Sequence, residues 1–298
     1  MEMYNSDRTF VVTGATSGIG LAVTEGLLRS GASVIGIGRS PVRCLAARTR
    51  LNILIPSARI AFLAADLSLQ ADVRSLANQV RDLLNAWGNP ALDGLLNNAG
   101  TFTYWLTLTP EGFEMQWAVN HLASFLLTNT LMPFLQASPM SRVVTVSSAS
   151  HYGARMNWND PQLRRHYSGL QAYGNTKLAN ILFTRELNRR LGSESTVRAY
   201  AADPGLVKTD IGIKGTPGLV SWVWKIRRSG GISAAEAARG ILFLLSEPSI
   251  QDVPNMYWKH GAPKAESHEA QNCVSAARLW KLSSEMCSLP VEESNASE

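Results

Sequence analysis

Cysteine is scarce in this chain, and Cys44, Cys273 and Cys287 lie far apart. They form no CxxC motif and no Cys/His cluster, so we expect neither a zinc site nor a disulfide framework. No metal is therefore expected in the functional site. Few, scattered cysteines suit a reducing compartment, and we expect a cytoplasmic protein.

Long apolar runs are also missing. No uninterrupted run approaches the roughly 20 apolar residues that cross a membrane. The first residues, MEMYNSDRTFVVTG, hold no apolar signal region. We therefore expect no transmembrane segment. The last residues, 288–298, are polar and are expected to form a loose tail.

Charge is limited as well, because charged residues make up 17% of the chain and the net charge is +5. Arginine and lysine form no dense stripe. A modest basic surface, or attraction to an anionic cofactor, explains the charge at least as well as nucleic acid does, so no nucleic-acid partner is expected. The 298 residues, of which 45% are apolar, can build one large α/β domain or two small ones.

What the chain does contain is a series of short β-branched runs separated by helical patterns. The predicted strands cover residues 8–13, 32–38, 59–65, 92–96, 141–146 and 197–202. In open α/β sheets, ligands bind outside the carboxyl ends of the strands. The residues that follow each predicted strand are therefore the candidates for a functional site.

The first predicted strand runs into the turn TGATSGIG, which opens a helix. Its glycines allow the backbone to approach a pyrophosphate, and the helix N-terminus offers free N–H groups and a positive dipole end. The GxxxGxG spacing differs from the usual GxGxxG fingerprint, but the strand–turn–helix context favours a nucleotide. The residues predicted to bind it are Gly14, Thr16, Ser17, Gly18, Ile19 and Gly20.

Arg39 follows the second predicted strand, where an NAD enzyme would place an acidic residue on the ribose 2′-hydroxyl. A guanidinium instead suits a 2′-phosphate, through forked, charge-assisted hydrogen bonds. Arg43 lies one turn further on and could assist. A surface arginine at a strand end is the plain alternative. We expect NADP(H) as the cofactor, with NAD(H) less favoured.

Polar and small residues follow the third and fourth predicted strands. Asp66 could accept a hydrogen bond from an adenine amino group, while Asp66 or Ser68 could also cap the helix predicted over 70–87. The stretch Asn97-Asn98-Ala99-Gly100 suits a backbone that passes close to a ligand. Both stretches are candidate walls of the nucleotide site.

A long helix is predicted over 110–134, with Asn120 inside it. A mid-helix asparagine competes with the helix's own hydrogen bonds. Asn120 therefore either faces solvent or holds a water or a backbone group near the site. The adjacent His121 is expected to be structural or exposed rather than catalytic.

Tyr173 and Lys177 are the strongest chemical pair, four residues apart in a segment predicted as helix. Positions i and i+4 share a helix face, so a phenol and an ammonium are expected side by side. The ammonium should lower the phenol's pKa from about 10, and such a pair can exchange a proton with a carbinol or carbonyl oxygen. A YxxxK pair that merely shares a helix face is the plain alternative.

Taken together, these motifs resemble one family, the short-chain dehydrogenases/reductases, over about residues 8–263. The matching pieces are TGATSGIG, Asp66, NNAG, Asn120, Ser147-Ser148, YGNTK and DPGLVKT. The long gap from Ser148 to Tyr173, the stretch WAVNHLASFLLT and the C-terminal region resemble the retinol-dehydrogenase-like group. The resemblance implies an α/β fold in a single domain over 1–298. The expected architecture is a Rossmann-like doubly wound parallel sheet of about seven strands, with helices on both faces.

The resemblance also assigns roles. Tyr173 would be the general acid/base, Lys177 would lower its pKa and bind the nicotinamide ribose, and Ser148 would hold the substrate oxygen. Asn120 would support a water that relays protons to Lys177. The cofactor would be lined by Asp66, Leu67, Asn97, Ala99 and Gly100, and flanked at its nicotinamide amide by Pro204, Gly205, Val207 and Thr209. Thr176 and Asp203 depart from the family's more frequent Ser and His or Asn.

Residues 210–233 have an apolar, tryptophan-bearing centre between glycines, and we interpret them as a substrate lid. A membrane-surface helix and a dimer contact are the alternatives. The helix predicted over 234–247 could pack against its twin in a homodimer or homotetramer, or within one subunit. The apolar content of the lid favours a hydrophobic substrate.

The expected function is an NADP(H)-dependent oxidoreductase that interconverts a hydrophobic ketone or aldehyde and its alcohol. The retinol-dehydrogenase-like group usually prefers NADP(H) and acts on such apolar substrates. Its membrane-bound members carry an N-terminal hydrophobic anchor, and we expect none in this chain. The alternatives are another chemistry on the same scaffold, such as C=C reduction or epimerisation, and a non-catalytic NADP(H) sensor.

Overall fold

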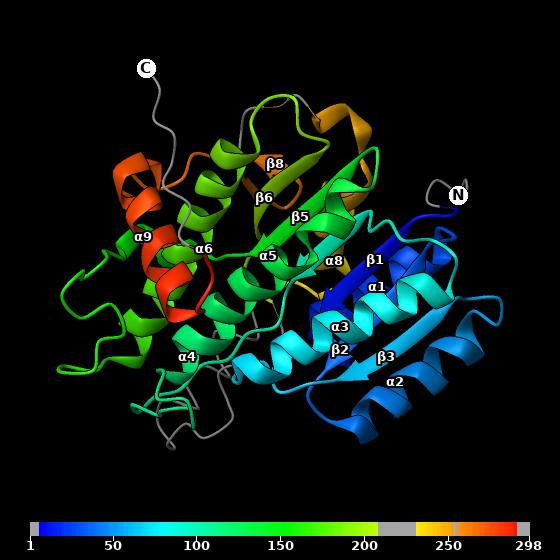
Figure 1. The fold of residues 1–298 in the computed structure, drawn as a ribbon, viewed down its shortest axis with the longest axis horizontal. Coiled ribbons are helices and arrows are strands. Elements are labelled where there is room, and N and C mark those ends of the chain that lie inside the picture. The colour runs from blue at the N-terminus through cyan, green and yellow to red at the C-terminus, as the bar shows by residue number, and fades with distance from the viewer. Residues whose placement is uncertain (1–5, 208–230, 252, 254–255, 291–298) are drawn as a thin grey trace.

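Eight strands form one sheet in the computed structural model, which describes residues 6–207, 231–251, 253 and 256–290. Their order across the sheet is β3-β2-β1-β4-β5-β6-β7-β8, with β7 and β8 antiparallel and the other pairs parallel (Figure 1). The strands are β1 Thr9–Thr13, β2 Ser33–Gly38, β3 Ile60–Ala64, β4 Gly94–Asn97, β5 Ser141–Val146, β6 Val197–Asp203, β7 Tyr257–Lys259 and β8 Ala262–Pro263. The predicted α/β fold is confirmed.

Helices cover both faces of this sheet (Figure 1). The longer ones are α1 Gly18–Arg29, α2 Pro41–Leu54, α3 Gln70–Ala86, α5 Ala123–Gln136, α6 Gly169–Leu191, α8 Ala234–Ser246 and α9 Cys273–Met286. Alternate strand residues point to opposite faces, so Val11 joins one apolar core with α3, α5, α6 and α9. Phe10 and Val12 join the other core, with α1 and α8.

Helix α8 packs inside the subunit, as one of the two sequence-based alternatives proposed. Its buried residues, among them Ile241 and Leu245, belong to the core beneath α1. The two helices approach closely at Gly26, where a Cβ would lie 2.5 Å from Leu242 Cδ1. This packing accounts for the apolar face of α8 that the sequence shows.

The prediction of one regular helix over 110–134 is wrong in two respects: the helix begins later, and it is interrupted. The helical segment begins at α4, Met115–Trp117, because the Glu114 carboxylate accepts a hydrogen bond from the Trp117 N–H at 2.6 Å. A π-helical turn, η1 Ala118–Leu122, then separates α4 from α5. Asn120 lies in this turn. Such turns occur mostly as single insertions in α-helices and often at functional sites.

The start of α3 is capped by a distant side chain rather than by Asp66 or Ser68. Its N-cap residue is Leu69. The Glu111 carboxylate accepts hydrogen bonds from the Gln70 N–H at 2.9 Å and from the Ala71 N–H at 3.4 Å. Asp66 instead accepts from the Ser68 N–H at 2.9 Å. The predicted local cap is therefore wrong, because a residue 41 positions later in the chain supplies it.

The C-terminal region is attached to α3 through backbone carbonyls. Gln70 Nε2 donates to the Met286 carbonyl at 2.8 Å, and Arg74 donates to the Cys287 carbonyl. Leu289 packs against the apolar core. The first residues of the predicted tail are thus held in place, and 291–298 lie outside the described residues.

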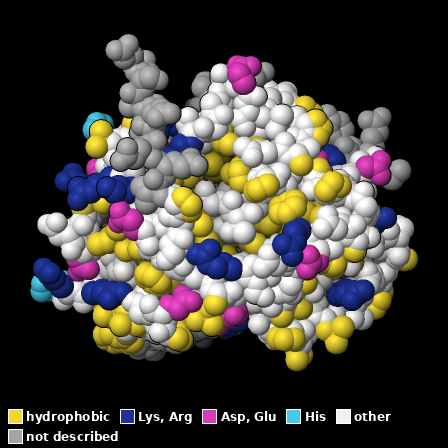
Figure 2. Space-filling model, in the orientation of Figure 1, with side chains coloured by type: hydrophobic (Ala, Val, Ile, Leu, Met, Phe, Trp, Pro, Cys, Tyr) yellow, Lys and Arg dark blue, Asp and Glu magenta, His cyan; other side chains and the backbone are white. Residues whose placement is uncertain are grey.

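One face of the molecule shows Lys and Arg at separate places, interspersed with Asp and Glu (Figure 2). In the described part of the chain, no helix combines the length and the apolar character needed to cross a membrane.

Replacing Glu111 by Ala should lower the free energy of unfolding by about 1 kcal/mol, because the first N–H groups of α3 lose their acceptor. Asp82→Ala, an exposed change on the same helix away from its first turn, is the matched control. Urea denaturation measures both. Equal small losses for the two variants would contradict the capping role of Glu111.

Candidate active site

The carboxyl ends of β1, β4, β5 and β6 meet at one edge of the sheet. Strand β1 pairs with β2 on one side and with β4 on the other. The first three strands are therefore added toward one side of the sheet, and the later strands toward the other. Such a reversal opens a crevice outside the strand ends, where open α/β sheets bind ligands. The predicted site residues that the structure describes follow these strand ends and those of β2 and β3, or lie on the helices beside them.

The glycine turn after β1 is locked to the loop after β4. Asn98 Nδ2 donates to the Thr13 carbonyl at 2.9 Å, and Thr13 Oγ1 accepts from the Asn98 N–H at 2.9 Å and the Ala99 N–H at 3.0 Å. A Cβ on Gly14 would lie 2.8 Å from Asn98 Nδ2, and a Cβ on Gly20 would lie 2.3 Å from the Gly14 carbonyl oxygen. The turn can therefore adopt this shape only with glycine at both positions.

Helix α1 begins at Gly18, directly after this turn. Its N-cap residue, Ser17, makes no side-chain capping hydrogen bond. Gly18 has a φ of +56°, which suits glycine. Because no side chain caps this helix start, its first backbone N–H groups are free to bind the phosphates of a nucleotide. The small residues of the adjacent turn leave room for such a ligand.

Arg39 lies exposed at the end of β2, beside the glycine turn. The two segments touch at Gly38, where a Cβ would lie 2.4 Å from Thr16 Cγ2 and 2.8 Å from Cys44 Sγ. Ser40 caps α2 by accepting from the Arg43 N–H at 3.4 Å. The guanidinium of Arg39 is thus on the same edge as the turn and is open to a ligand.

Asn97 and Asn120 are both buried, and their amides bind protein groups. Asn97 Nδ2 donates to Thr128 Oγ1 at 2.9 Å. Asn120 Oδ1 accepts from the Thr101 N–H at 2.7 Å, and Asn120 Nδ2 donates to the Thr101 carbonyl at 3.0 Å and to Thr176 Oγ1 at 3.2 Å. Of the alternatives proposed for Asn120, the structure shows that it binds a backbone group, the peptide of Thr101. It fixes the loop after Gly100 to α6.

Tyr173 and Lys177 lie on α6, and Lys177 joins this helix to the end of β5. Lys177 Nζ donates to the Val146 carbonyl at 3.0 Å and lies 5.4 Å from the centroid of the Tyr173 ring. Ser147 Oγ donates to the Lys177 carbonyl at 2.8 Å. The ring of Phe102 meets the Tyr173 ring edge-on, with centroids 6.1 Å apart. The phenol and the amine are therefore neighbours at the carboxyl edge.

The pKa of Tyr173 lies above its ordinary value of about 10, so the predicted net lowering is wrong. Burial raises the pKa of Tyr173 to about 12, and the Asp203 carboxylate adds to the rise. Burial lowers the pKa of Lys177 to about 8, while Asp203 opposes this change. Loss of water around the phenolate is the largest cause of this rise.

Ser148 follows β5, and the loop after it packs closely on α6. Ser148 Oγ accepts from the Ser150 N–H at 3.2 Å. A Cβ on Gly174 would lie 3.0 Å from the Ser150 carbonyl oxygen. Gly174 thus lets the helix next to Tyr173 approach the loop that carries Ser148.

His151 is a buried residue of this loop that sequence reasoning did not single out. Its Nδ1 lies 2.8 Å from the Ser148 carbonyl oxygen, and its Nε2 accepts from the Ser267 N–H at 3.1 Å. Burial lowers its pKa, so the neutral ring donates through Nδ1. Its position three residues after Ser148 was the available signal. His121 is structural, as expected, because it is buried with Nε2 at 2.8 Å from Ser283 Oγ.

The geometry is therefore a glycine turn, an arginine beyond β2, and a tyrosine–lysine pair at one sheet edge. A family model described as short chain dehydrogenase matches residues 8–217. This chain belongs to the short chain dehydrogenase family. The resemblance seen in the sequence is confirmed. Membership indicates an oxidoreductase that acts on alcohol and carbonyl groups with a nicotinamide cofactor.

Relatives within the family include retinol dehydrogenases. The chain is 34% identical to human retinol dehydrogenase 14 over 95% of its own length and 87% of that protein. It is 35% identical to bovine dehydrogenase/reductase SDR family member 13, over 98% of this chain and 76% of that one. Among solved structures, an uncharacterised protein from Mycobacterium paratuberculosis aligns with a TM-score of 0.73 at 34% identity, covering 96% of both chains.

The remaining site predictions of this dehydrogenase follow β6. Gly205 has a φ of +76°, and the His260 ring occupies the space where its Cβ would lie, at 2.4 Å. Val207 pairs with Ile232 in a parallel bridge, and the Ile232 N–H donates to the Leu206 carbonyl at 2.8 Å. Val207, just before the predicted lid, therefore lies beside Ile232, near the end of the lid. Thr209 and residues 210–230 lie outside the described residues.

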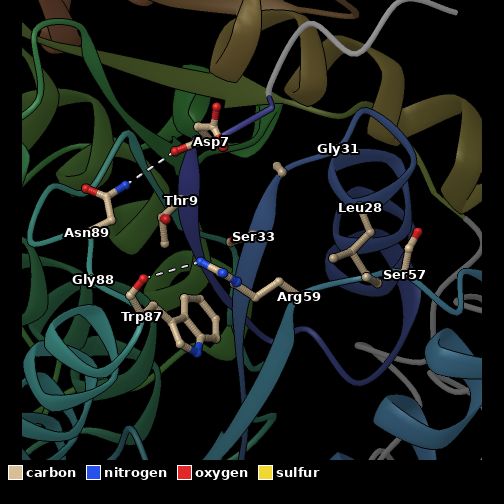
Figure 3. A pocket seen from close by; sticks show the side chains of 12 residues that line it. Asp7, Thr9, Leu28, Gly31, Ser33, Ser57, Arg59, Trp87, Gly88 and Asn89 are labelled. Atoms are coloured by element: carbon tan, nitrogen blue, oxygen red, sulfur yellow. Dashed lines mark hydrogen bonds between the residues drawn. The ribbon is translucent and has the colours of Figure 1, made fainter.

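A cavity of about 420 Å³ lies at the opposite end of the sheet (Figure 3). Its walls include Thr9 and Ser33 at the amino ends of β1 and β2, and Arg59 just before β3. Arg59 donates to the Trp87 carbonyl at 3.4 Å, and Asn89 donates to the Asp7 carbonyl at 3.3 Å. None of the predicted site residues lines this cavity, so it is separate from the candidate active site.

Gly20→Ala should lower the free energy of unfolding by about 1–3 kcal/mol and weaken NADPH binding, because the new methyl group overlaps the Gly14 carbonyl. Gly153→Ala is the matched control, since a Cβ there meets nothing within 4 Å. Thermal unfolding and NADPH fluorescence titration provide the two readouts. A Gly20→Ala protein with unchanged stability and NADPH affinity would contradict the close approach described for the turn.

Proposed function

We propose that this protein is an NADP(H)-dependent oxidoreductase that interconverts a hydrophobic ketone or aldehyde and its alcohol, with Tyr173 as general acid/base. The observation that carries the proposal is the position of Tyr173 and Lys177. They share α6 at the carboxyl edge, and Lys177 Nζ is held by the Val146 carbonyl at 3.0 Å. The family and its retinol dehydrogenase relatives support the reaction class.

The residues of the crevice fit a nicotinamide dinucleotide. The pyrophosphate would lie against the glycine turn and the start of α1. The space between Gly14 and Gly20 at this turn would be filled by a Cβ at either position. Leu67, Ala99 and Gly100 would line the cofactor, and Asp66 would accept a hydrogen bond from its adenine amino group. When bound, the cofactor supplies or accepts the hydride.

The protein's own part in the reaction is to move one proton. In carbonyl reduction, the Tyr173 hydroxyl donates its proton to the substrate oxygen, and in alcohol oxidation the phenolate accepts it. The Lys177 ammonium stabilises the phenolate that remains after donation. Ser148 Oγ would donate a hydrogen bond to the same oxygen and hold the carbonyl toward the cofactor.

Asn120 supports this arrangement from behind. It holds both the N–H and the carbonyl of Thr101 and also binds Thr176 Oγ1, on the turn of α6 between Tyr173 and Lys177. The loop after Gly100 is therefore fixed relative to the catalytic helix. A water held between Asn120 and Lys177 would relay protons back to Tyr173.

Arg39 supports NADP(H) over NAD(H). It is exposed beside the glycine turn, where the adenosine ribose of a dinucleotide would lie. Its guanidinium can form forked, charge-assisted hydrogen bonds with a 2′-phosphate. No carboxylate follows β2 at this point to bind a free 2′-hydroxyl.

The proposed substrate is hydrophobic because apolar side chains follow the strand ends at this edge. Trp105 and Leu106 are exposed after β4, Leu170 is exposed at the start of α6, and Leu206 is exposed after β6. Phe102, in the loop after β4, meets the Tyr173 ring edge-on. We propose that residues 210–233 serve as the substrate lid; of these, the structure describes 231–233. Val207, which precedes this segment, pairs with Ile232 near its end.

Tyr173→Phe should lower carbonyl turnover by on the order of 10²-fold or more, because the proton donor is lost, while NADPH still binds. Tyr200→Phe is the matched control, since the Tyr200 hydroxyl is also buried and donates to the Ile250 carbonyl in the core on the other side of the sheet. Steady-state kinetics and NADPH titration test both variants. Full turnover by Tyr173→Phe would rule out the acid/base assignment.

Arg39→Asp should raise the apparent KM for NADPH by roughly ten- to a hundredfold and that for NADH far less, because charged hydrogen bonds to the 2′-phosphate are lost. Arg48→Asp, an equal charge change at an exposed position of α2, is the control. Kinetics with both cofactors measure the difference. Equal effects on NADPH and NADH would defeat the phosphate-binding role.

A further inference from the structure

Asp203 is a buried carboxylate at the candidate active site that the proposed reaction does not use. It is the last residue of β6 and is 3% exposed. Its Oδ1 accepts from the Gly205 N–H at 2.8 Å, and its Oδ2 accepts from Tyr257 Oη at 2.8 Å. Both donors are neutral, so these hydrogen bonds leave its negative charge unbalanced.

The carboxylate lies at the same level of the sheet as the Lys177 amine. Strands β5 and β6 are neighbours, with Val146 opposite Ala202. The Val146 carbonyl binds Lys177 Nζ at 3.0 Å, and Ala202 directly precedes Asp203. The Ser147 N–H also donates to the Ala202 carbonyl at 2.8 Å. A buried cation and a buried anion thus flank one point where two strands end.

Other charged and titratable groups surround Asp203 from three sides. They are Tyr173 and Lys177 on α6, His151 and Tyr152 on η2 (Ala149–Gly153), Tyr257 and Lys259 on β7, and His260 and Lys264 after β7. His151 is held neutral by its acceptor contact with the Ser267 N–H. His260 and Lys264 are exposed and Lys259 is half-buried. Within the described residues, Lys177 is the buried lysine of this group.

Two buried charges of opposite sign stabilise each other when each would otherwise lack a partner. We propose that Asp203 is a positioning residue that pairs electrostatically with Lys177 across the ends of β5 and β6, and so keeps Lys177 protonated beside Tyr173. The consequence for catalysis rests on the proposed function. The pairing itself does not.

The sign of the effect follows from the charges. Asp203 opposes the lowering of the pKa of Lys177 by burial and adds to the rise in the pKa of Tyr173. Removing its charge should therefore lower both pKa values. Lys177 and Tyr173 would then lose their protons at lower pH, and carbonyl reduction would decline at lower pH.

A double-mutant cycle tests the pair without substrate or cofactor. Asp203→Asn keeps the hydrogen-bonding shape and removes the charge, and Lys177→Met removes the cation. Urea denaturation at pH 6.5 should show that Asp203→Asn destabilises the wild-type protein but is neutral or stabilising in the Lys177→Met background. Equal losses in both backgrounds would overturn the proposal, whatever the activity of the protein.

A pH profile then separates pairing from a merely structural role. The alkaline decline of carbonyl reduction in Asp203→Asn should move down by on the order of one pH unit. Tyr257→Phe removes a hydrogen bond to Asp203 but leaves the carboxylate charge, which then acts more strongly on Lys177. The alkaline decline of carbonyl reduction in this variant should therefore move to higher pH. The Tyr257→Phe profile decides the matter even if Asp203→Asn does not fold. A downward or absent shift in that variant would contradict the pairing.

Failure of the proposed function has a different signature. A wild-type protein that reduces no carbonyl substrate, yet shows the non-additive double-mutant cycle, would refute the function and retain the pair. A protein that reduces carbonyls with an additive cycle would do the reverse.

Discussion

The attachment of helix α6 to the end of strand β5 is the interaction on which the candidate site depends. Lys177 Nζ and Asn180 Nδ2 both donate to the Val146 carbonyl, at 3.0 and 3.1 Å, and Ser147 Oγ donates to the Lys177 carbonyl at 2.8 Å. These bonds fix the rotation of the helix, so that Tyr173 faces the carboxyl edge. The parallel sheet brings the glycine turn and the Ser148 loop to this edge, because all parallel strands end there.

Burial gives this attachment its chemical consequence. The same exclusion of water that strengthens hydrogen bonds makes charges at Tyr173 and Lys177 costly. The pKa of Tyr173 rises to about 12 and that of Lys177 falls to about 8. A neutral phenol is suited to donate a proton to a carbonyl oxygen. Burial favours the neutral form of Lys177, and the Asp203 carboxylate at the same strand ends opposes this effect.

The sequence was informative where a local pattern decides the structure. The strand at 141–146, the glycine turn and the helix of Tyr173 all follow from short runs of residues, and the structure agrees. It was less informative where distant residues decide. Glu111 rather than Asp66 or Ser68 caps α3, and a π-helical turn interrupts the helix around Asn120. The pKa of Tyr173 was predicted in the wrong direction, because spacing shows a neighbouring cation but not the depth of burial. His151 also contacts Ser267, 116 residues away, and Asp203 contacts Tyr257, 54 residues away, and local spacing does not predict such contacts.

The most direct test of the account is the consumption of NADPH and NADH with hydrophobic aldehydes and ketones, including retinal, long-chain aldehydes and steroid ketones, with identification of each product. The account predicts that at least one class is converted to its alcohol, with NADPH preferred. Products reduced at a C=C bond, or epimerised without net reduction, would contradict the assignment of Tyr173 as the proton donor to a carbonyl oxygen. So would the absence of any alcohol product despite tight NADPH binding.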